Sequence, residues 1–426
     1  MTRSMGFCNW QNGRGLCATL VALSLALVSS TGFAKGELQA AIDAAQAGAT
    51  LLLDDGLYEG KLVIRKPLTL KAQGPNVVIR GDGTGDVILV QASHVTLEGL
   101  HVEASGVQHQ SVDAGIHVDG AQDVHILRNT FTDCLFGINF EKTHASSIVG
   151  NTITSKPFAP GLRGDGFRLW YSHNNLISHN TTNAVRDNVF WYSSGNTVEY
   201  NEGRGSRYSL HFMYANRNTV AHNHYDHNAV GVFLMFTQDV DVFDNVISHA
   251  SGPFGVGIGM KESSNVTVRH NELLYNARGF YLDSSPYQPG TLNTFTDNRI
   301  FFNTTGFLLH GTLLPSHFED NAFKGNIDDV NNDTPESHLE INQWRHNYWD
   351  NYQGFDRNRD GFGDIAHEQY LFADRLWSYL PPAKLFYGSP ILDVMNFLWR
   401  LMPFSEPQRL LTDPEPRMSA PQWSEP

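Results

Sequence analysis

One segment in the middle of the chain recurs after 22 residues. Ser209–Met213 (Ser-Leu-His-Phe-Met) ends ten residues before Asn223, and Gly231–Met235 (Gly-Val-Phe-Leu-Met) ends ten residues before Asn245. A fixed period of about 20–50 residues is the signature of a solenoid, in which each repeat packs against its two neighbours. This repeat therefore constrains the fold more strongly than any local pattern.

Each repeat contains three short apolar runs and one corner asparagine. The first run opens at Gly115-Ile116, Gly137-Ile138, Gly166-Phe167, Asn188-Val189, Ser209-Leu210, Gly231-Val232, Gly257-Ile258, Gly279-Phe280 and Gly306-Phe307. The asparagines usually follow 14 residues later, at Asn129, Asn151, Asn180, Asn201, Asn223, Asn245, Asn271, Asn298 and Asn321. A second run precedes each asparagine and a third follows it. Three short strands per turn of about 22 residues predict an all-β fold, a right-handed parallel β-helix.

The corner asparagines have a structural explanation. Asn tolerates the left-handed backbone of a corner, and its amide can bond to the backbone and to the same residue one turn away. Asn228, Asn276 and Asn303 form a second column of this kind, and Cys134 falls in it. We interpret Cys134 as a packed corner residue rather than a metal thiolate.

The regions outside the repeats divide the chain further. We assign residues 1–34 to an export signal, 35–60 to an N-terminal cap that contains a helix, and 61–346 to the β-helix. Residues 347–389 form a cap rich in aromatic, Asp and Asn residues, and 390–404 form a C-terminal apolar helix. The Pro- and Glu-rich residues 405–426 are predicted to be a disordered tail.

The first 34 residues have the order of a cleaved signal peptide. Arg3 and Arg14 are their only charges, and an apolar run from Leu16 to Val28 leads to small residues ending at Ala34. The alternative is a membrane anchor, for which this run is short. Removal of the two arginines changes the formal net charge from −14 to −16. This acidity argues against nucleic acid or anionic lipid as the main partner.

Alternate residues of the opening strands face the solvent and make an unusual surface. The outward column includes a group of apolar residues, Trp170, Phe190, Tyr192, Met213, Phe233 and Met235, with Arg168 beside them. A contiguous exposed apolar patch marks a binding surface, and aromatic residues with Met and Arg are the usual core of a protein interface. We predict that Arg168, Trp170, Phe190, Tyr192 and Phe233 bind a partner protein. Aromatic platforms also bind sugars, so that alternative stays open.

His211 and Met213 share one side of one turn, and Met235 lies over Met213 at the strand spacing of ~4.8 Å. An imidazole with two thioethers is a soft ligand set that suits copper(I). We therefore predict a copper(I) site at these three residues. The alternative is that the two methionines only line a hydrophobic docking patch.

A second candidate metal site follows the repeats. Asp356, Asn358, Asp360 and Asp364 occupy positions 1, 3, 5 and 9 of a loop with glycine at position 6, like the first part of a calcium loop. Position 12, which is Glu in an EF-hand, is His367 here. The alternatives are a structural calcium site and a plain polar turn.

The segment between Pro390 and Pro403 is predicted to form a helix with apolar residues on several of its sides. It either packs back on the repeats or presents residues such as Phe397 and Leu398 to a membrane partner.

The outer column contains no arrangement typical of a polysaccharide-cleaving β-helix. Asp119 and Glu141 are the only neighbouring carboxylates, and they lie away from the aromatic centre. Hydrolases need a placed acid and base, and neither paired aspartates nor the Asp-Pro-His-Asp motif of mannuronan epimerases occurs. We conclude that the protein is not an enzyme.

Several longer stretches are more specific than the repeat: Gly164–Ser172, Ser209–Tyr214, Gly252–Glu262, Tyr348–Asp364, Ala373–Trp377, Gly388–Pro390 and Pro403–Pro407. Together they resemble the NosD family, whose members take part in maturation of nitrous oxide reductase. The resemblance implies a periplasmic, non-catalytic protein. It also implies as partners an ABC transporter (permease and ATPase), a copper-carrying lipoprotein and nitrous oxide reductase, with contact to the membrane only through the transporter. It does not say which residues bind copper.

Two other functions stay open. One is an exported β-helix that binds or modifies an acidic polysaccharide, and the other is a purely structural exported scaffold.

Overall fold

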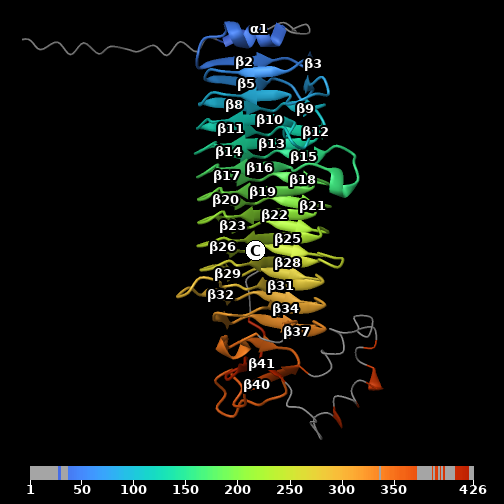
Figure 1. The fold of residues 1–426 in the computed structure, drawn as a ribbon, viewed down its shortest axis with the longest axis vertical. Helices are drawn as coiled ribbons and strands as arrows, with labels where there is room; N and C mark the ends of the chain where they lie inside the picture. Colours follow the sequence, from blue (N-terminus) through green and yellow to red (C-terminus); the bar gives the residue numbers. More distant parts are fainter. Residues whose placement is uncertain are drawn as a thin grey trace, which may run out of the picture.

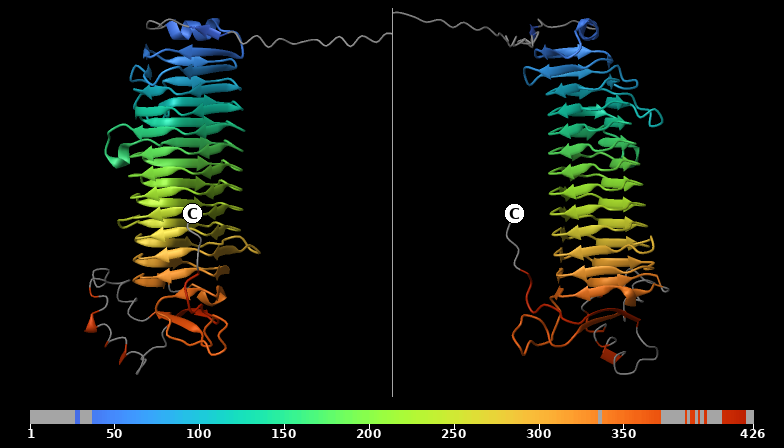
Figure 2. Two further views of the ribbon diagram at one scale, coloured as in Figure 1. Left: turned by 180° about the vertical axis from the view of Figure 1, so that it is seen from behind. Right: turned by 90° about the vertical axis from the view of Figure 1, so that its left-hand side faces the viewer.

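Three parallel sheets wind around one axis into a right-handed β-solenoid of about 13 turns (Figure 1). The computed structural model describes residues 27–29, 37–334, 337–371, 386, 389–391, 394, 397–398 and 408–421. Figure 2 shows the same stack from behind and from one side, with strands crossing the long axis at every level. The predicted all-β parallel β-helix is confirmed.

Each turn adds one strand to each sheet. Sheet A consists of β1 (Leu27–Ser29), β2 (Ala49–Leu53), β5 (Leu68–Ala72), β8 (Val95–Glu98), β11 (Val124–Leu127), β14 (Ser147–Val149), β17 (Leu176–Ser178), β20 (Thr197–Glu199), β23 (Thr219–Ala221), β26 (Asp241–Phe243), β29 (Thr267–Arg269), β32 (Asn293–Thr296), β35 (Ser316–Glu319) and β38 (Gln343–Arg345). Sheet B consists of β3 (Gly56–Glu59), β6 (Val77–Arg80), β9 (His101–Glu103), β12 (Thr130–Cys134), β15 (Thr152–Ser155), β18 (Thr181–Asn183), β21 (Glu202–Arg204), β24 (His224–Asp226), β27 (Val246–Ser248), β30 (Glu272–Leu274), β33 (Arg299–Phe301), β36 (Ala322–Lys324) and β39 (Tyr348–Trp349). Sheet C consists of β4 (Leu62–Ile64), β7 (Ile88–Val90), β10 (Ala114–Asp119), β13 (Phe136–Glu141), β16 (Phe167–Trp170), β19 (Asp187–Trp191), β22 (Tyr208–Met213), β25 (Val230–Met235), β28 (Val256–Lys261), β31 (Arg278–Asp283), β34 (Thr305–His310) and β37 (Asp328–Asn332).

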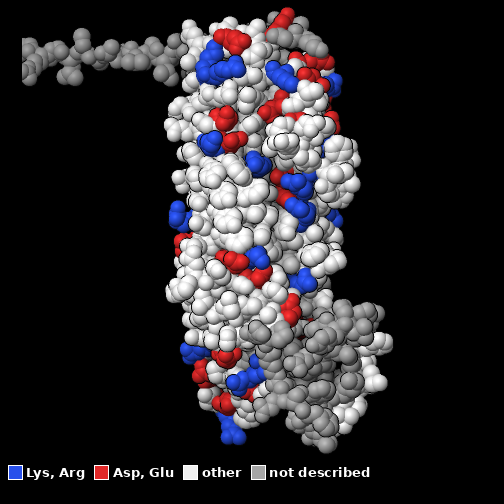
Figure 3. Space-filling view, in the orientation of Figure 1, with Lys and Arg blue, Asp and Glu red and all other residues white. Residues whose placement is uncertain are grey.

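Alternate residues of the three sheets fill the interior. Leu210 and Phe212 of β22 pair in register with Val232 and Leu234 of β25, and all four side chains are fully buried. Because side chains alternate along a strand, a shift of one residue would exchange core and surface. On the face shown in Figure 3, much of the surface over the middle turns carries no Lys, Arg, Asp or Glu, and the charged residues form small separate clusters.

Short helical segments accompany the solenoid. Helix α1 (Glu37–Ala44) buries Leu38 and Ile42 against the first turns, as expected of a cap. The 3-10 segments η1 (Pro160–Leu162) and η2 (Leu339–Ile341) lie between successive turns. No helix among the described residues is long and apolar enough to cross a membrane.

Most of the predicted export signal lies outside the described residues. Its residues 27–29 form β1, which pairs with β2 in parallel at the N-terminal edge of sheet A.

A ladder of asparagines joins the turns at the corner between sheets A and B. Each Oδ1 accepts hydrogen bonds from the backbone N–H and the side-chain amide of the preceding asparagine; Asn223 donates to Asn245 over 3.0 and 2.9 Å. The ladder runs through Asn129, Asn151, Asn180, Asn201, Asn223, Asn245, Asn271, Asn298, Asn321 and Asn347, all of them buried. Every buried amide is thereby paired, as buried polar groups must be. The predicted ladder is confirmed.

The left-handed backbone at this corner belongs to a different residue than expected. A positive φ is found at His222 (56°), Asp244 (55°) and His270 (56°), each of which directly precedes a ladder asparagine. The preceding residue makes the bend and stays at the surface, and the bend turns the asparagine inward. The expectation that the asparagine itself adopts this conformation is wrong.

Cys134 is fully buried at the corner between sheets B and C, where Asn276 and Asn303 continue the second asparagine column. Burial raises the pKa of the Cys134 thiol to about 12, so the thiol stays protonated at neutral pH. These observations agree with a packed corner residue.

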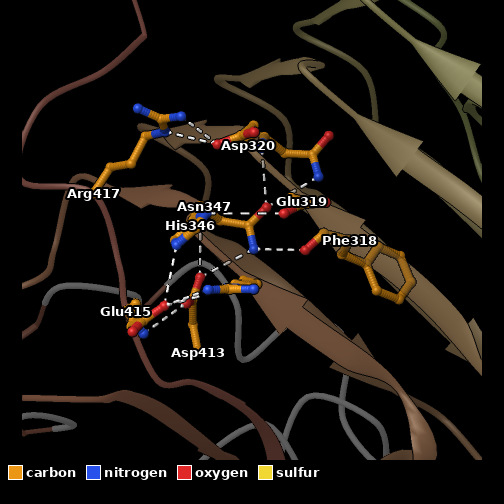
Figure 4. Close-up of polar contacts among 10 residues, drawn as sticks. Phe318, Glu319, Asp320, His346, Asn347, Asp413, Glu415 and Arg417 are labelled. Atoms are coloured by element: carbon orange, nitrogen blue, oxygen red, sulfur yellow. Dashed lines mark hydrogen bonds and ion pairs between the residues drawn. The ribbon is translucent and has the colours of Figure 1, made fainter. Parts of the chain in front are cut away.

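The C-terminal tail closes the end of the solenoid (Figure 4). Its strand β41 (Gln408–Asp413) pairs antiparallel with β40 (His367–Leu371). The Oδ2 atom of Asp413 accepts hydrogen bonds from the backbone and side-chain N–H groups of Asn347 at 2.9 and 3.0 Å, and from the indole of Trp349 at 3.2 Å. A carboxylate thus ends the asparagine ladder.

The tail makes further contacts beyond Asp413. Glu415 accepts a hydrogen bond from Arg345 at 3.0 Å, and Arg417 donates to Asp320 at 2.9 Å (Figure 4). Leu410 and Leu411 are buried. The prediction of a disordered tail is therefore wrong for residues 408–421: composition alone favoured disorder, but an open solenoid end needs a cover.

The predicted C-terminal apolar helix is described at five positions. Pro390, Ile391, Val394, Phe397 and Leu398 all have helical backbone conformation. The side chains of Ile391, Val394, Phe397 and Leu398 are 66%, 54%, 60% and 55% exposed. These four apolar side chains are thus available for contact with another molecule; the other residues of 390–404 lie outside the described part.

We predict that Asp413→Ala destabilises the last turns by about 1–3 kcal/mol, because three buried N–H donors lose their shared acceptor. Asp413→Asn should retain most of the stability, since an asparagine Oδ1 accepts the same bonds at every other level of the ladder. Hydrogen exchange of residues 343–349 measures the difference. Equal protection in Asp413→Ala and the unaltered protein would show that the tail does not support the ladder.

Candidate functional site

The outer side of sheet C carries the three predicted copper ligands and three of the residues predicted to bind a partner. Four successive strands present Arg168 and Trp170 (β16), Val189 and Trp191 (β19), His211 and Met213 (β22), and Phe233 and Met235 (β25). We call these eight residues the sheet C face. Because the strands pair in parallel and in register, equivalent side chains lie directly above one another.

His211 lies in a largely apolar environment on this face. Its ring stacks on Tyr208 with centroids 4.6 Å apart and lies edge-on to Phe233 at 6.4 Å. Its Nε2 atom is 3.1 Å from Sδ of Met235. Burial lowers the pKa of His211 to about 4, so the imidazole is neutral at pH 7 and keeps a free lone pair for a metal.

Met213 completes the group. It pairs in register with Met235 on the neighbouring strand, at the usual strand spacing of about 4.8 Å. Both thioether side chains are half-buried. The structure thus brings together the imidazole and the two thioethers that the sequence singled out, and leaves them reachable from solvent.

Phe190 does not belong to this face. It is fully buried and stacks on Phe212 at 4.7 Å. The pairing of β19 with β22 shifts register, which aligns Val189 with His211 and Trp191 with Met213. The prediction of Phe190 as a surface residue is wrong because this turn is one residue shorter than its neighbours. The signal was present in the sequence, where 13 rather than 14 residues separate the strand opening at position 188 from its corner asparagine at position 201.

Tyr192 lies at the corner after β19 rather than on the strand. Its φ is 51°, and its ring stacks between Tyr171 at 4.9 Å and Tyr214 at 5.2 Å. Phe236 extends this column, 4.8 Å from Tyr214. Trp170 meets Tyr192 edge-on at 5.7 Å. The sheet C face therefore continues into an aromatic column at the corner, of which the sequence predicted one member.

Arg168 supports the edge of the face. Its Nη1 donates a hydrogen bond to Oδ1 of Asn139 at 3.0 Å, and its guanidinium lies 5.1 Å from the ring centroid of Trp170. A cation over an indole is a favourable contact that fixes the orientation of the ring.

An ion pair that the sequence analysis missed, between the buried Asp187 and the exposed Arg207, orients the start of β22. Asp187 is 1% exposed and accepts a hydrogen bond from Nε of Arg207 at 2.9 Å. The Arg207 guanidinium lies 5.2 Å from the ring of Tyr208, on which His211 stacks. Asp187 is the first residue of β19, and Arg207 comes just before β22. The alternation of side chains along a strand does not predict which side chains meet at strand ends, so only the structure reveals this contact.

The loop at residues 356–364 is held by its own side chains. Asp356, Asn358 and Asp360 each accept hydrogen bonds from backbone N–H groups two to five residues further on. Asp364 accepts one from the backbone of residue 357 at 2.7 Å. His367, at position 12, lies in β40 and stacks on a buried indole at 4.7 Å, so it does not complete the loop. Calcium binding stays a prediction.

Comparison with known proteins places the chain among its relatives. A family model described as "Periplasmic copper-binding protein (NosD)" matches residues 149–354, which include the whole sheet C face, and a right-handed β-helix model matches residues 75–182. The curated "Probable ABC transporter binding protein NosD" of Stutzerimonas stutzeri is 27% identical over 364 residues, covering 82% of this chain and 83% of that protein. The protein of the same name from Pseudomonas aeruginosa is 26% identical over 376 residues, with the same coverage.

The chain is similar to the NosD family over residues 149–354 and to two curated NosD proteins over most of its length. The family resemblance seen in the sequence is thereby confirmed.

Solved structures show the fold alone. The catalytic domain of a GH87 α-1,3-glucanase in complex with nigerose is 12% identical, with a TM-score of 0.57 over 70% of this chain and 64% of that chain. The A-module of the mannuronan C-5 epimerase AlgE6 from Azotobacter vinelandii is 16% identical, with a TM-score of 0.50 over 72% of this chain and 92% of that chain. At this identity the similarity describes the solenoid and no activity.

We predict that calcium raises the melting temperature of the protein through the loop at residues 356–364. An ion that binds only the folded state at 100 times its dissociation constant stabilises it by about 2.7 kcal/mol. Asp360→Ala should abolish the shift, whereas the exposed Asp241→Ala on β26 should not. Thermal unfolding with calcium and with a chelator measures the effect. An equal calcium shift in Asp360→Ala would contradict a site in this loop.

Proposed function

We propose that the protein is a non-catalytic periplasmic assembly factor that works with an ABC transporter to mature the copper sites of nitrous oxide reductase. Similarity to a family described as periplasmic and copper-binding supports the location and the metal. The names of both curated relatives support the association with an ABC transporter. The reductase and a copper-carrying lipoprotein follow from the family resemblance of the sequence.

We infer further that His211, Met213 and Met235 bind copper(I) in transit. The observation that carries this inference is the 3.1 Å contact between Nε2 of His211 and Sδ of Met235, with Met213 adjacent in register. Neutral imidazole and thioethers are soft ligands that favour cuprous copper. Their half-exposed position suits an ion that is handed on rather than stored.

The surroundings of these ligands suit a docking partner. Trp170 and Trp191 contact each other at 5.1 Å beside the ligands, and the aromatic column at the corner extends the surface. Aromatic residues carry much of the binding energy of protein interfaces. We assign this surface to the protein that delivers or receives copper, and we assign the exposed Phe397 and Leu398 to contact with the permease.

Polysaccharide binding or modification is less well supported. Asp119 and Glu141 pair on β10 and β13, outside the four strands of the sheet C face. The chain also carries a formal net charge of −14, which disfavours an acidic polymer.

Combined replacement of the three ligand residues, His211→Ala with Met213→Leu and Met235→Leu, should weaken copper(I) binding at least about tenfold, equivalent to about 1.4 kcal/mol. The fold should persist, since the three side chains point out of the core. Competition with a chromogenic copper(I) chelator measures affinity, and copper analysis of nitrous oxide reductase from cells carrying the variant measures function. Met418→Leu, at another surface methionine, is the control. Normal copper loading of the reductase in the triple variant would refute the ligand assignment.

Copper(I) affinity should stay constant from pH 7 down to about pH 5. An ordinary histidine, with a pKa of about 6.5, would be protonated over this range and lose about tenfold in affinity per pH unit. Burial lowers the pKa of His211 to about 4, so protons compete with the metal only near that pH. Chelator competition at a series of pH values tests this. A steady loss of affinity that begins near pH 6.5 would mean that a solvated histidine binds the ion instead.

A further inference from the structure

A second group of metal-ligating side chains lies at the corner between sheets B and C. Asp226 ends β24, and His227 and His249 occupy the same corner position of two consecutive turns. One donor atom from each of the three residues lies within 4.8 Å of the others. Sheet C and its methionines contribute nothing to this group, so it is separate from the copper site proposed above.

The two imidazoles converge on one carboxylate. Nδ1 of His227 is 2.6 Å from Oδ2 of Asp226, and Nδ1 of His249 is 2.9 Å from Oδ1 of the same residue. The imidazole rings stack with centroids 4.5 Å apart and an interplanar angle of 16°. Each ring therefore directs the same nitrogen toward the space beside Asp226.

The backbone of the solenoid builds this arrangement. His227 and His249 both have a φ of 54°, the left-handed corner conformation that directs their side chains to the surface. Tyr275, at the same corner one turn further on, stacks on His249 at 5.4 Å. Gly205 occupies the corner on the other side and has no side chain. The pair of imidazoles is thus supported from one end and open at the other.

The carboxylate is held in its ionised form. Although burial acts in the opposite direction, hydrogen bonds from His227, Ser248 and His249 lower the pKa of Asp226 to about 2. The hydroxyl of Ser248 donates to Oδ1 of Asp226 at 2.8 Å and so fixes its rotation. A hydroxyl that donates to the carboxylate in this way is typical of carboxylates that bind metals. The nearest cation, Arg204, is 4.0 Å from Oδ2 and 65% exposed, so it is free to move away.

We propose that Asp226, His227 and His249 form a surface site for a divalent transition-metal ion of the zinc(II) class. The ion binds the two Nδ1 atoms in place of their hydrogen bonds to the carboxylate. Each neutral ring gives its Nδ1 proton to water and takes up one at Nε2, so both rings stay neutral. Two imidazoles and one carboxylate suit borderline divalent metals, whereas the thioethers of the sheet C face suit copper(I). Three protein ligands leave a coordination position for water or for a donor atom of another molecule.

Isothermal titration of the full chain with zinc chloride tests the site. We expect one saturable binding event that is lost in His227→Ala combined with His249→Ala. His222→Ala is a matched control, because His222 is also a stacked corner histidine but faces only Asp244, at 3.8 Å. That variant should bind zinc like the unaltered protein, and so should the triple variant of the copper site.

Three results would overturn the proposal: no saturable zinc binding by the unaltered chain, undiminished binding by the double histidine variant, or loss of binding in the copper-site variant. Far-UV circular dichroism of each variant verifies the fold, and Asp226→Asn provides a second test that leaves both histidines in place. It should weaken zinc binding by removing the one anionic ligand.

Discussion

The asparagine ladder between sheets A and B is the interaction on which the rest of the structure depends. The backbone N–H and the side-chain amide of each asparagine donate to the Oδ1 atom of the asparagine in the next turn, as Asn223 does to Asn245. The ladder aligns the corners of successive turns. The alternation of side chains along each strand then determines which residues point to the solvent and which pack in the core. His211, Met213 and Met235 lie together because two consecutive turns keep this register. The final link, Asp413, brings the C-terminal tail into the same network.

Much of this architecture could be predicted from the sequence, because the same residue pattern recurs in each turn and each recurrence supports the same structural assignment. The ladder, most of the inward positions and the grouping of His211, Met213 and Met235 on one face all followed from the period. The prediction failed where one turn departs from the period: the turn that contains β19 is one residue shorter, which places Phe190 inside and Trp191 outside. The ladder tolerates this change because Asn180 still reaches Asn201, 21 residues away. The tail was missed for a different reason, since its contacts join residues 64 to 97 positions apart and no local pattern reports them.

The surface chemistry of the protein divides between two regions. On the sheet C face, thioethers and a neutral imidazole are surrounded by aromatic rings, and low polarity keeps the imidazole unprotonated. At the corner between sheets B and C, two solvated imidazoles meet an ionised carboxylate. Both proposed sites depend on the same property of the scaffold, because the register places equivalent residues of adjacent turns one above the other without a folded pocket. A rigid solenoid can therefore offer metal ligands on an open surface, where partner proteins reach them.

X-ray absorption at the copper K edge, on protein loaded with one equivalent of copper(I), tests the central claim most directly. The account predicts a first coordination shell that contains sulfur together with imidazole nitrogen, and loss of the sulfur contribution in Met213→Leu combined with Met235→Leu. A shell of nitrogen and oxygen alone, unchanged by these substitutions, would contradict it and would place the copper away from the sheet C face.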